Sequence, residues 1–266
     1  MRLGEPQVGQ VWRWRHRGRG PPAAAVTVVW VTTEAGGGTA SPWWRTMFRS
    51  TWFPLGASLV ITGLVLSFVA KPYWVPSGSM EPTLQIGDRI LVNRLAFVGA
   101  DPGTGDVIVF DAGAEWVSPT SIPENPLKAA LRWVGEVSGF GPSSPHTLVK
   151  RVIGTPGQTV QCCTDTGAVT VDGEELSEPY VANDFAFTAG SLDCATVPRS
   201  TRCFDPVTVP AGSYLMLGDN RTNSADSAAA CRTPGAPEDC WRWAGRDSIV
   251  GKAVLIFWPI GRWAAL

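Results

Sequence analysis

The sequence predicts an all-β fold class for the residues that follow position 71. The chain of 266 residues contains 29 glycines and 22 prolines, a content that is high for a helical protein and typical of a chain with many turns. Short valine-rich runs, either alternating or continuously apolar, lie between these turn residues. Many short strands joined by tight turns are therefore expected.

Runs with a strand pattern follow one another along this part of the chain. They are RILVNRL (89–95), DVIVF (106–110), TLVKRVIG (147–154), TVQC (159–162), AVTVDG (168–173), PVTVP (206–210), SYLMLG (213–218) and GKAVLIFW (251–258). Residues 125–139 are the exception, because Leu127, Ala130, Leu131 and Val134 repeat at helical spacing. We expect a helix there that packs on the protein surface, with contact to a membrane surface as the alternative.

Charge is distributed unevenly at the start of the chain. Residues 1–49 carry seven arginines but only Glu5 and Glu34 as acidic residues, which predicts a cytoplasmic tail of little order. Residues 50–70 carry no charged side chain and, at about 1.5 Å per helical residue, suffice to cross a hydrocarbon core of about 30 Å. We expect a single transmembrane helix at 50–70, a cytoplasmic N-terminus and residues 71–266 outside the plasma membrane.

Two alternatives stay open for this region. A cleaved secretory signal is also apolar, but the run is long for such a signal and begins about 50 residues into the chain. Met47 is as suitable a start of the protein as Met1.

All the cysteines follow the apolar run, which fits an oxidising compartment. We hypothesise that Cys231 and Cys240 close a local loop. A second bridge is expected from Cys162 or Cys163 to the region of Cys194 and Cys203. No CxxC pair with a partnering CxxC or histidine pair suggests zinc, and no nucleotide motif is present, so neither a metal nor another cofactor is expected.

The formal net charge of −1 gives no uniform basic surface, which argues against nucleic acid as a partner. The first segment that suggests chemistry is VPSGSMEPTL (75–84), where Pro76 and Pro82 restrict the backbone around two serines. Such a segment is often only a turn, but this one is rigid enough to present the Ser79 hydroxyl. A serine is a weak nucleophile until a base takes its proton.

Two residues are candidates for that base. His146 would give a serine–histidine protease, although no motif supports it. Lys150 lies in the middle of the apolar strand 147–154, where loss of water would lower the pKa of its amine from about 10.4 toward neutrality. The opposite interpretation places Lys150 on the solvated face of the strand.

A third segment, GDNRTNSADS (218–227), is a dense polar loop directly after an apolar strand. Its aspartate, asparagine, arginine and serine side chains suit a network that orients a buried lysine. Together with LVKRVIGTPGQTV (148–160) and PSGSMEPTL, this order of segments closely resembles the type I signal peptidases of bacteria, and the composition resembles actinobacterial members. The similarity runs through most of residues 72–259, leaving the loops at 111–146, 174–205 and 228–248 without support.

That resemblance implies a coiled antiparallel β-sheet catalytic domain with a smaller inserted β domain at about 160–212. It implies a membrane-bound serine endopeptidase that removes signal peptides from exported preproteins after Ala-x-Ala-like sites. Ser79 would be the nucleophile and Lys150 the general base, with the Ser79 N–H and the Ser77 hydroxyl forming the oxyanion hole. Ser224 would hydrogen-bond Lys150. The residues implied to support this site are Asp219, Arg221 and Asp226, and those implied to bind substrate are Pro76, Met80, Leu84, Leu148 and Val149.

The implied partners are the signal peptides of preproteins and membrane lipid, and the translocation machinery is a further candidate. The sequence departs from the family at Ala228, because an arginine usually follows the Asp-Ser pair of the last segment, and Arg232 is the candidate substitute. Gln158 and Thr222 stand where acidic residues are common. The competing hypotheses are another membrane-tethered serine protease with a dedicated substrate, such as a pilin, and a non-enzymatic β-rich binding protein.

Overall fold

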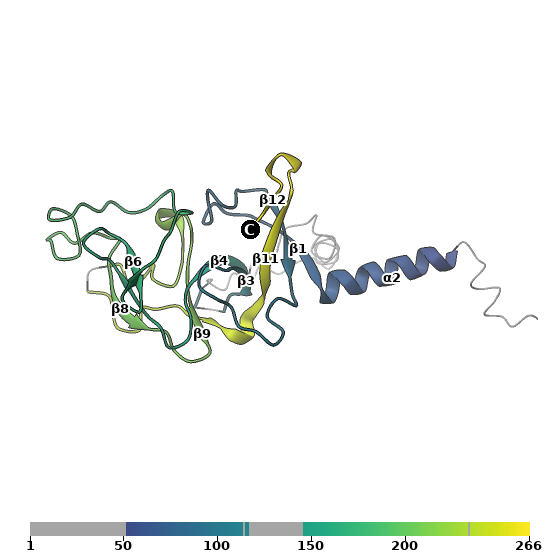
Figure 1. Cartoon of the computed structure of the whole chain (residues 1–266), viewed down its shortest axis with the longest axis horizontal. Coiled ribbons are helices and arrows are strands. Elements are labelled where there is room, and N and C mark those ends of the chain that lie inside the picture. The colour runs from purple at the N-terminus through teal and green to yellow at the C-terminus, as the bar shows by residue number, and fades with distance from the viewer. Residues whose placement is uncertain (1–51, 114, 117–145, 234) are drawn as a thin grey trace, which may run out of the picture. The chain divides into compact units, whose positions relative to one another are not determined.

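The computed structural model describes residues 52–113, 115–116, 146–233 and 235–266 (Figure 1). Most regular structure in these ranges is β-sheet, as the all-β prediction required. The expected tail at 1–49 and the expected helix at 125–139 lie outside the described residues, as does most of the unsupported loop at 111–146.

Helix α2 spans Trp52–Phe68 and consists of uncharged residues. The predicted helix at 50–70 is wrong at its C-terminal end, because Ala70 begins strand β1 (Ala70–Trp74) and pairs with Asn93 of β2 (Arg89–Asn93). An antiparallel partner for the backbone thus ends the helix before Ala70. Among the described helices, none combines the length and the apolar character that crossing a membrane requires.

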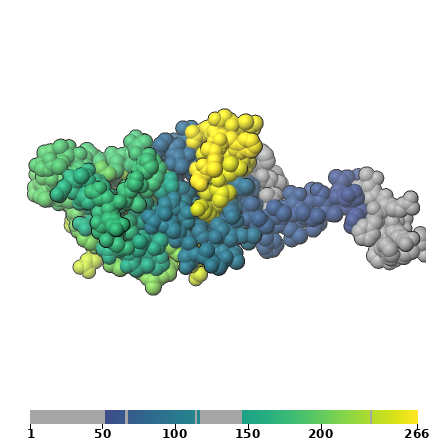
Figure 2. Space-filling view, viewed as in Figure 1, coloured from purple at the N-terminus to yellow at the C-terminus, as the bar shows by residue number. Residues whose placement is uncertain are grey.

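The larger sheet has eight strands in the order β1-β2-β11-β3-β4-β9-β10, with β12 paired to β11. Its other members are β3 (Val107–Asp111), β4 (Thr147–Gly154), β9 (Ser213–Leu217), β10 (Ala244–Gly245), β11 (Ile249–Trp258) and β12 (Ala264–Ala265). All its described pairings are antiparallel. The last long strand, β11, lies between β2 and β3, so the C-terminal residues (yellow in Figure 2) lie against the first strands of the sheet.

A second sheet forms from the chain between β4 and β9. It has four strands in the order β7-β6-β5-β8. Their bounds are Thr159–Cys162 for β5, Val169–Val171 for β6, Glu174–Glu175 for β7 and Phe204–Thr208 for β8. The resemblance placed a smaller β insertion in this stretch, and its status as a separate domain stays a prediction.

Short elements and the cysteine bridges complete the fold. The 3-10 turns are η1 (Arg221–Asn223), η2 (Arg246–Ser248) and η3 (Ile260–Arg262). The predicted Cys231–Cys240 bridge is confirmed. The predicted bridge from Cys162 or Cys163 to the Cys194 region is wrong, because Cys162 bonds Cys163 and Cys194 bonds Cys203. The two pairs are nevertheless neighbours, since the sulfurs of Cys163, Cys194 and Cys203 lie within 4.8 Å of one another.

The core of the larger sheet fixes the segment that follows β1. Val75, Met80 and Leu84 are buried in one apolar cluster with Ile90 and Val92 of β2. Burial of side chains this large stabilises a fold by about 1.5–3 kcal/mol each. The turn between Val75 and Leu84 is therefore held at both ends by the core.

Candidate active site

The turn that carries Ser79 is ordered by its own backbone. The N–H of Glu81 donates to the carbonyl of Gly78 at 3.2 Å, and the N–H of Leu84 donates to that of Met80 at 2.9 Å. Ser79 itself is 8% exposed. Ser79 is thus a nearly buried residue in a hydrogen-bonded turn, five residues beyond β1.

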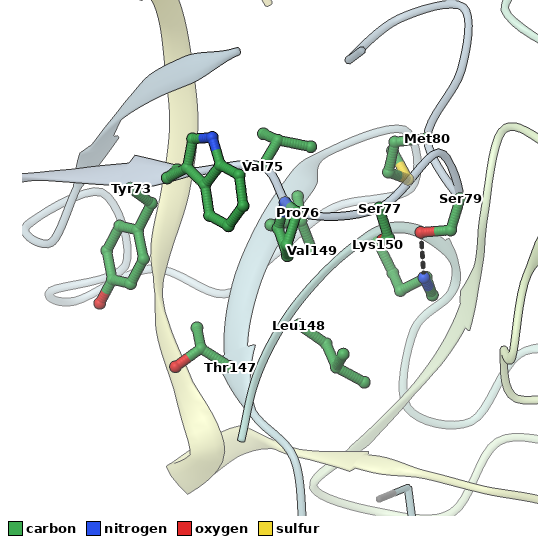
Figure 3. A pocket seen from close by; sticks show the side chains of 11 residues that line it. Tyr73, Val75, Pro76, Ser77, Ser79, Met80, Thr147, Leu148, Val149 and Lys150 are labelled. Atoms are coloured by element: carbon green, nitrogen blue, oxygen red, sulfur yellow. Dashed lines mark hydrogen bonds between the residues drawn. The ribbon is translucent and has the colours of Figure 1, made fainter. Parts of the chain in front are cut away.

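Lys150 lies in β4 opposite Ile108 of β3 and is 3% exposed, so the predicted burial of its side chain is confirmed. Its Nζ lies 2.6 Å from Ser79 Oγ and donates a hydrogen bond to it (Figure 3). Burial lowers the pKa of Lys150 from 10.5 to about 8, while the negative charges of Asp226 and Asp219 raise it in part. A useful fraction of the amine is therefore neutral at mildly alkaline pH, and a neutral amine accepts the proton of a serine.

Each of the two buried aspartates has a positively charged partner. Asp219 accepts two hydrogen bonds from the guanidinium of Arg151, at 2.9 and 2.6 Å, and a third from the Thr83 hydroxyl. Asp226 pairs with Arg232 at 3.0 Å. Arg232, the candidate substitute for the arginine missing after Ser227, thus contacts Asp226 from the loop of the Cys231–Cys240 bridge, and its equivalence to that arginine stays a prediction.

Asn220 is a site residue that the sequence analysis did not single out. Its side-chain amide donates to the carbonyl of Gly78 at 3.1 Å, and its backbone N–H donates to the carbonyl of Ser79 at 3.1 Å. Asn220 therefore links the turn that carries Ser79 to the loop after β9. We call this turn, residues 75–84, the nucleophile turn, after the role predicted for Ser79. Its place inside the polar segment 218–227 was the only sequence signal for this role.

Ser224 does not make the hydrogen bond to Lys150 that the resemblance implied, because its Oγ is buried without a partner among the described residues. The hydroxyl lies against Gly218 instead. A Cβ added to Gly218 would meet Ser224 Oγ at 2.3 Å and the carbonyl oxygen of Ser79 at 2.5 Å. The loop and the nucleophile turn approach so closely that only glycine fits between them.

Arg221, another predicted supporting residue, faces away from the serine–lysine pair toward Glu178, with which it forms a buried ion pair. Its Nε also donates to the carbonyl of Gly218 at 3.0 Å. Arg221 therefore holds the loop in place rather than contacting Lys150.

A pocket opens beside the serine–lysine pair and has mainly apolar walls (Figure 3). It is lined by Tyr73, Trp74, Val75, Pro76, Ser77, Ser79, Met80, Thr147, Leu148, Val149 and Lys150. Of the predicted substrate residues, Leu84 is not part of this lining, because it is 0% exposed in the core. The exposed His146 is not part of the lining either, so the histidine alternative gains no support.

Metal ligands among the described residues are limited to one candidate group, the sulfurs of Cys163, Cys194 and Cys203. All three belong to disulfides, and a disulfide sulfur is not the thiolate that binds a metal. These residues therefore do not fit a metal site while the bridges are intact.

The arrangement thus places a serine hydroxyl in contact with a buried amine in one mainly apolar pocket on a β-sheet scaffold, the side chains that a serine hydrolase with an amine base requires. The family model described as signal peptidase, peptidase S26, matches residues 49–258. The chain belongs to this family, as the resemblance predicted.

Several curated relatives agree with the match. The chain is 42% identical over 225 residues to a signal peptidase I of Mycobacterium tuberculosis, covering 79% of this chain and 72% of the relative. It is 37% identical to a probable signal peptidase I of Mycobacterium leprae, covering 76% of this chain and 73% of that one. These mycobacterial relatives bear out the resemblance to actinobacterial members. A solved signal peptidase I of Enterococcus faecalis matches with 26% identity and a TM-score of 0.31, over 57% of this chain and 96% of that one.

Proposed function

We propose that the protein is a serine endopeptidase that removes N-terminal signal peptides from exported preproteins, with Ser79 as nucleophile and Lys150 as general base. The observation that carries the assignment is the 2.6 Å distance between Lys150 Nζ and Ser79 Oγ in a nearly dry site. The curated relatives named signal peptidase I supply the substrate class.

In the proposed reaction, the neutral amine of Lys150 takes the proton of Ser79 as Oγ attacks the scissile carbonyl carbon. The resulting oxyanion accepts hydrogen bonds from the Ser79 N–H and the Ser77 hydroxyl. Lys150 then returns the proton to the leaving amine, and an acyl-enzyme remains. A water that gives its proton to Lys150 hydrolyses this ester, and the released proton goes back to Ser79 Oγ.

The lining of the pocket supports the proposed Ala-x-Ala preference. Pro76, Met80, Leu148 and Val149 give it apolar walls directly beside Ser79 and Lys150. An extended preprotein segment with small residues fits such a site better than one with bulky residues.

We also propose that the apolar residues that precede β1 attach the enzyme to the plasma membrane in a single pass, with the catalytic part outside the cell. Side chains of α2 are exposed along its length, for example Leu59 at 73% and Phe68 at 63%. The extended chain from Ala70 to Ser79 reaches at most about 30 Å, which keeps cleavage near the lipid surface. Flotation of the purified protein with liposomes tests the attachment; recovery of the intact protein in the lipid-free fraction would contradict it.

The decisive test compares cleavage of a preprotein with an Ala-x-Ala site by the unaltered protein in detergent and by three variants. We expect Ser79→Ala and Lys150→Ala to lose cleavage while their thermal unfolding stays cooperative, and His146→Ala to cut normally. Full activity in EDTA is expected as well, since the proposed step uses no metal. Loss of cleavage in His146→Ala with retention in Lys150→Ala would refute the assignment of the base. A folded, unaltered protein without any cleavage would favour the non-enzymatic binding protein.

A further inference from the structure

Residues 178–183, which we call the strap, run from the second sheet to the polar loop after β9. Glu178 forms a buried ion pair with Arg221 of that loop, and the Arg221 side chain is 3% exposed. The backbone N–H of Arg221 donates to the carbonyl of Asn183 at 2.8 Å. The strap is therefore fastened at both its ends to the loop that holds the nucleophile turn.

Tyr180, in the middle of the strap, lies between two charged side chains. The guanidinium carbon of Arg151 is 3.8 Å from the centroid of the tyrosine ring, a close cation–π contact. The Tyr180 hydroxyl donates to a carboxylate oxygen of Glu178 at 3.3 Å. Burial, followed by the negative charge of Glu178, raises the pKa of Tyr180 above its ordinary value, so the ring stays neutral over the working pH range.

Arg151 follows Lys150 in β4, and successive side chains of a strand point to opposite faces. The planar guanidinium of Arg151 donates two hydrogen bonds to Asp219, at 2.9 and 2.6 Å, and one to the carbonyl of Gly105 at 2.8 Å. One face of the guanidinium stacks on the Tyr180 ring. A guanidinium held in this way cannot tilt away from Asp219 without breaking its contact with the Tyr180 ring.

The negative charges of Asp226 and Asp219 both raise the pKa of Lys150. Asp219 forms an ion pair with Arg151, and Asp226 forms one with Arg232. The charged groups that act on Tyr180 are Glu178, Arg151, Arg221 and Asp219. Of the two aspartate–arginine pairs behind the lysine, only the Asp219 pair contacts the strap.

We propose that Tyr180 is a positioning residue of the peptidase, which holds Arg151 against Asp219 and so sets the charge that the catalytic lysine experiences. The inference rests on the proposed function, because it assigns to the strap a part in adjusting the base of that reaction. Without the ring, Arg151 keeps its hydrogen bonds to Asp219 and Gly105 but loses the contact that restrains the face of its guanidinium, so its ion pair with Asp219 loosens. The less compensated carboxylate then favours the protonated form of Lys150. Less of the neutral amine is then present at a given pH.

The experiment measures kcat/KM for a signal-peptide substrate against pH in the full-length protein, because this profile reports the ionisations of the free enzyme. Tyr180→Leu is expected to move the midpoint of the acidic limb upward by about half a pH unit, which is about a threefold loss of kcat/KM at pH 7. Tyr180→Phe keeps the ring over Arg151 and is expected to keep the midpoint. Arg151→Lys, which loses the planar stack, is expected to shift in the same direction as Tyr180→Leu.

The outcomes separate this inference from the proposed function. A folded Tyr180→Leu with the unaltered midpoint overturns the positioning role, even if its kcat is lower, because a purely structural role leaves the ionisation of the base in place. An equal shift in Tyr180→Phe overturns it too, since the hydroxyl and not the ring would then be responsible. If Tyr180→Leu does not fold, Tyr180→Met fills similar space without a ring, and failure of both to fold assigns the residue to structure alone. Failure of the proposed function would show instead as no cleavage by the folded, unaltered protein, or as cleavage that persists in Ser79→Ala.

Discussion

The backbone N–H of Asn220 donates to the carbonyl oxygen of Ser79, and the Asn220 side chain donates to the carbonyl of Gly78, both at 3.1 Å. One residue of the loop after β9 thus holds two successive peptide units of the nucleophile turn. The contact fixes the direction in which the Ser79 hydroxyl meets Lys150, because rotation of either peptide unit would break a buried hydrogen bond.

Replacement of the Asn220 side chain tests this positioning. Asn220→Ala removes one of the two donors to the carbonyl of Gly78, which still accepts from the Glu81 N–H. The lost hydrogen bond costs about 0.5–1.5 kcal/mol, and we expect kcat to fall about 2- to 13-fold with a smaller change in KM. Steady-state kinetics on a preprotein substrate measure both constants. Asn223→Ala in the same loop is the matched control, since Asn223 is exposed. Equal kcat values for the two variants would contradict the role of Asn220.

Burial of the Lys150 amine is expected to lower the free energy of unfolding of the protein. Its pKa is about 8 in the folded protein, against 10.5 as the ordinary value, so the unfolded chain binds the proton more tightly. The cost of burying the charged amine is complete below pH 8 and disappears as the pH rises to 10.5.

Lys150→Met therefore gives an inactive protein that is more stable than the unaltered one by about 1–3 kcal/mol at pH 7. The difference should shrink as the pH approaches 10. Urea unfolding of both proteins at pH 7 and pH 10 measures it. A variant that is less stable at pH 7 would show that Lys150 contributes contacts worth more than the burial of its charge.

Gly218 is expected to tolerate no side chain. Gly218→Ala places a Cβ at 2.5 Å from the carbonyl oxygen of Ser79 and pushes the loop away from the nucleophile turn. We expect kcat to drop at least tenfold and the free energy of unfolding to fall by about 1–3 kcal/mol. Gly245→Ala serves as the control, because nothing lies within 4 Å of its added Cβ. Similar activity and stability in the two variants would rule out the close approach.

The Cys231–Cys240 bridge closes the short loop that contains Arg232. Replacing both cysteines with serine removes the constraint on the unfolded chain, and we expect a loss of about 2–3 kcal/mol in the free energy of unfolding. Thermal unfolding of the oxidised protein and of the double variant measures the loss. Peptide mapping under non-reducing conditions should recover Cys231 joined to Cys240; finding them in separate peptides would contradict the bridge.

Much of the larger sheet follows from local pattern. The runs 89–95 and 147–154 contain β2 and β4, and the run 106–110 covers all of β3 except Asp111, because valine-rich alternation between turn residues is a local pattern. Strands as short as β7, β10 and β12 were missed, since two residues carry no detectable period. The end of α2 was misplaced for a related reason, because the pairing of Ala70 with Asn93, which is 23 residues away, is not visible in an apolar run.

The sequence by itself determined the family and the all-β class, and it singled out Ser79 and Lys150. It could do so because three motif segments in a fixed order match one family of enzymes, and each residue type in them suits the chemistry of that family. The tertiary structure decided how these residues are held. Asn220 meets the Gly78 and Ser79 carbonyls, Arg232 pairs with Asp226, and the Ser224 hydroxyl packs on Gly218 without reaching Lys150. The first of these contacts joins segments more than 140 residues apart, and the other two depend on the folded path of the loop after β9.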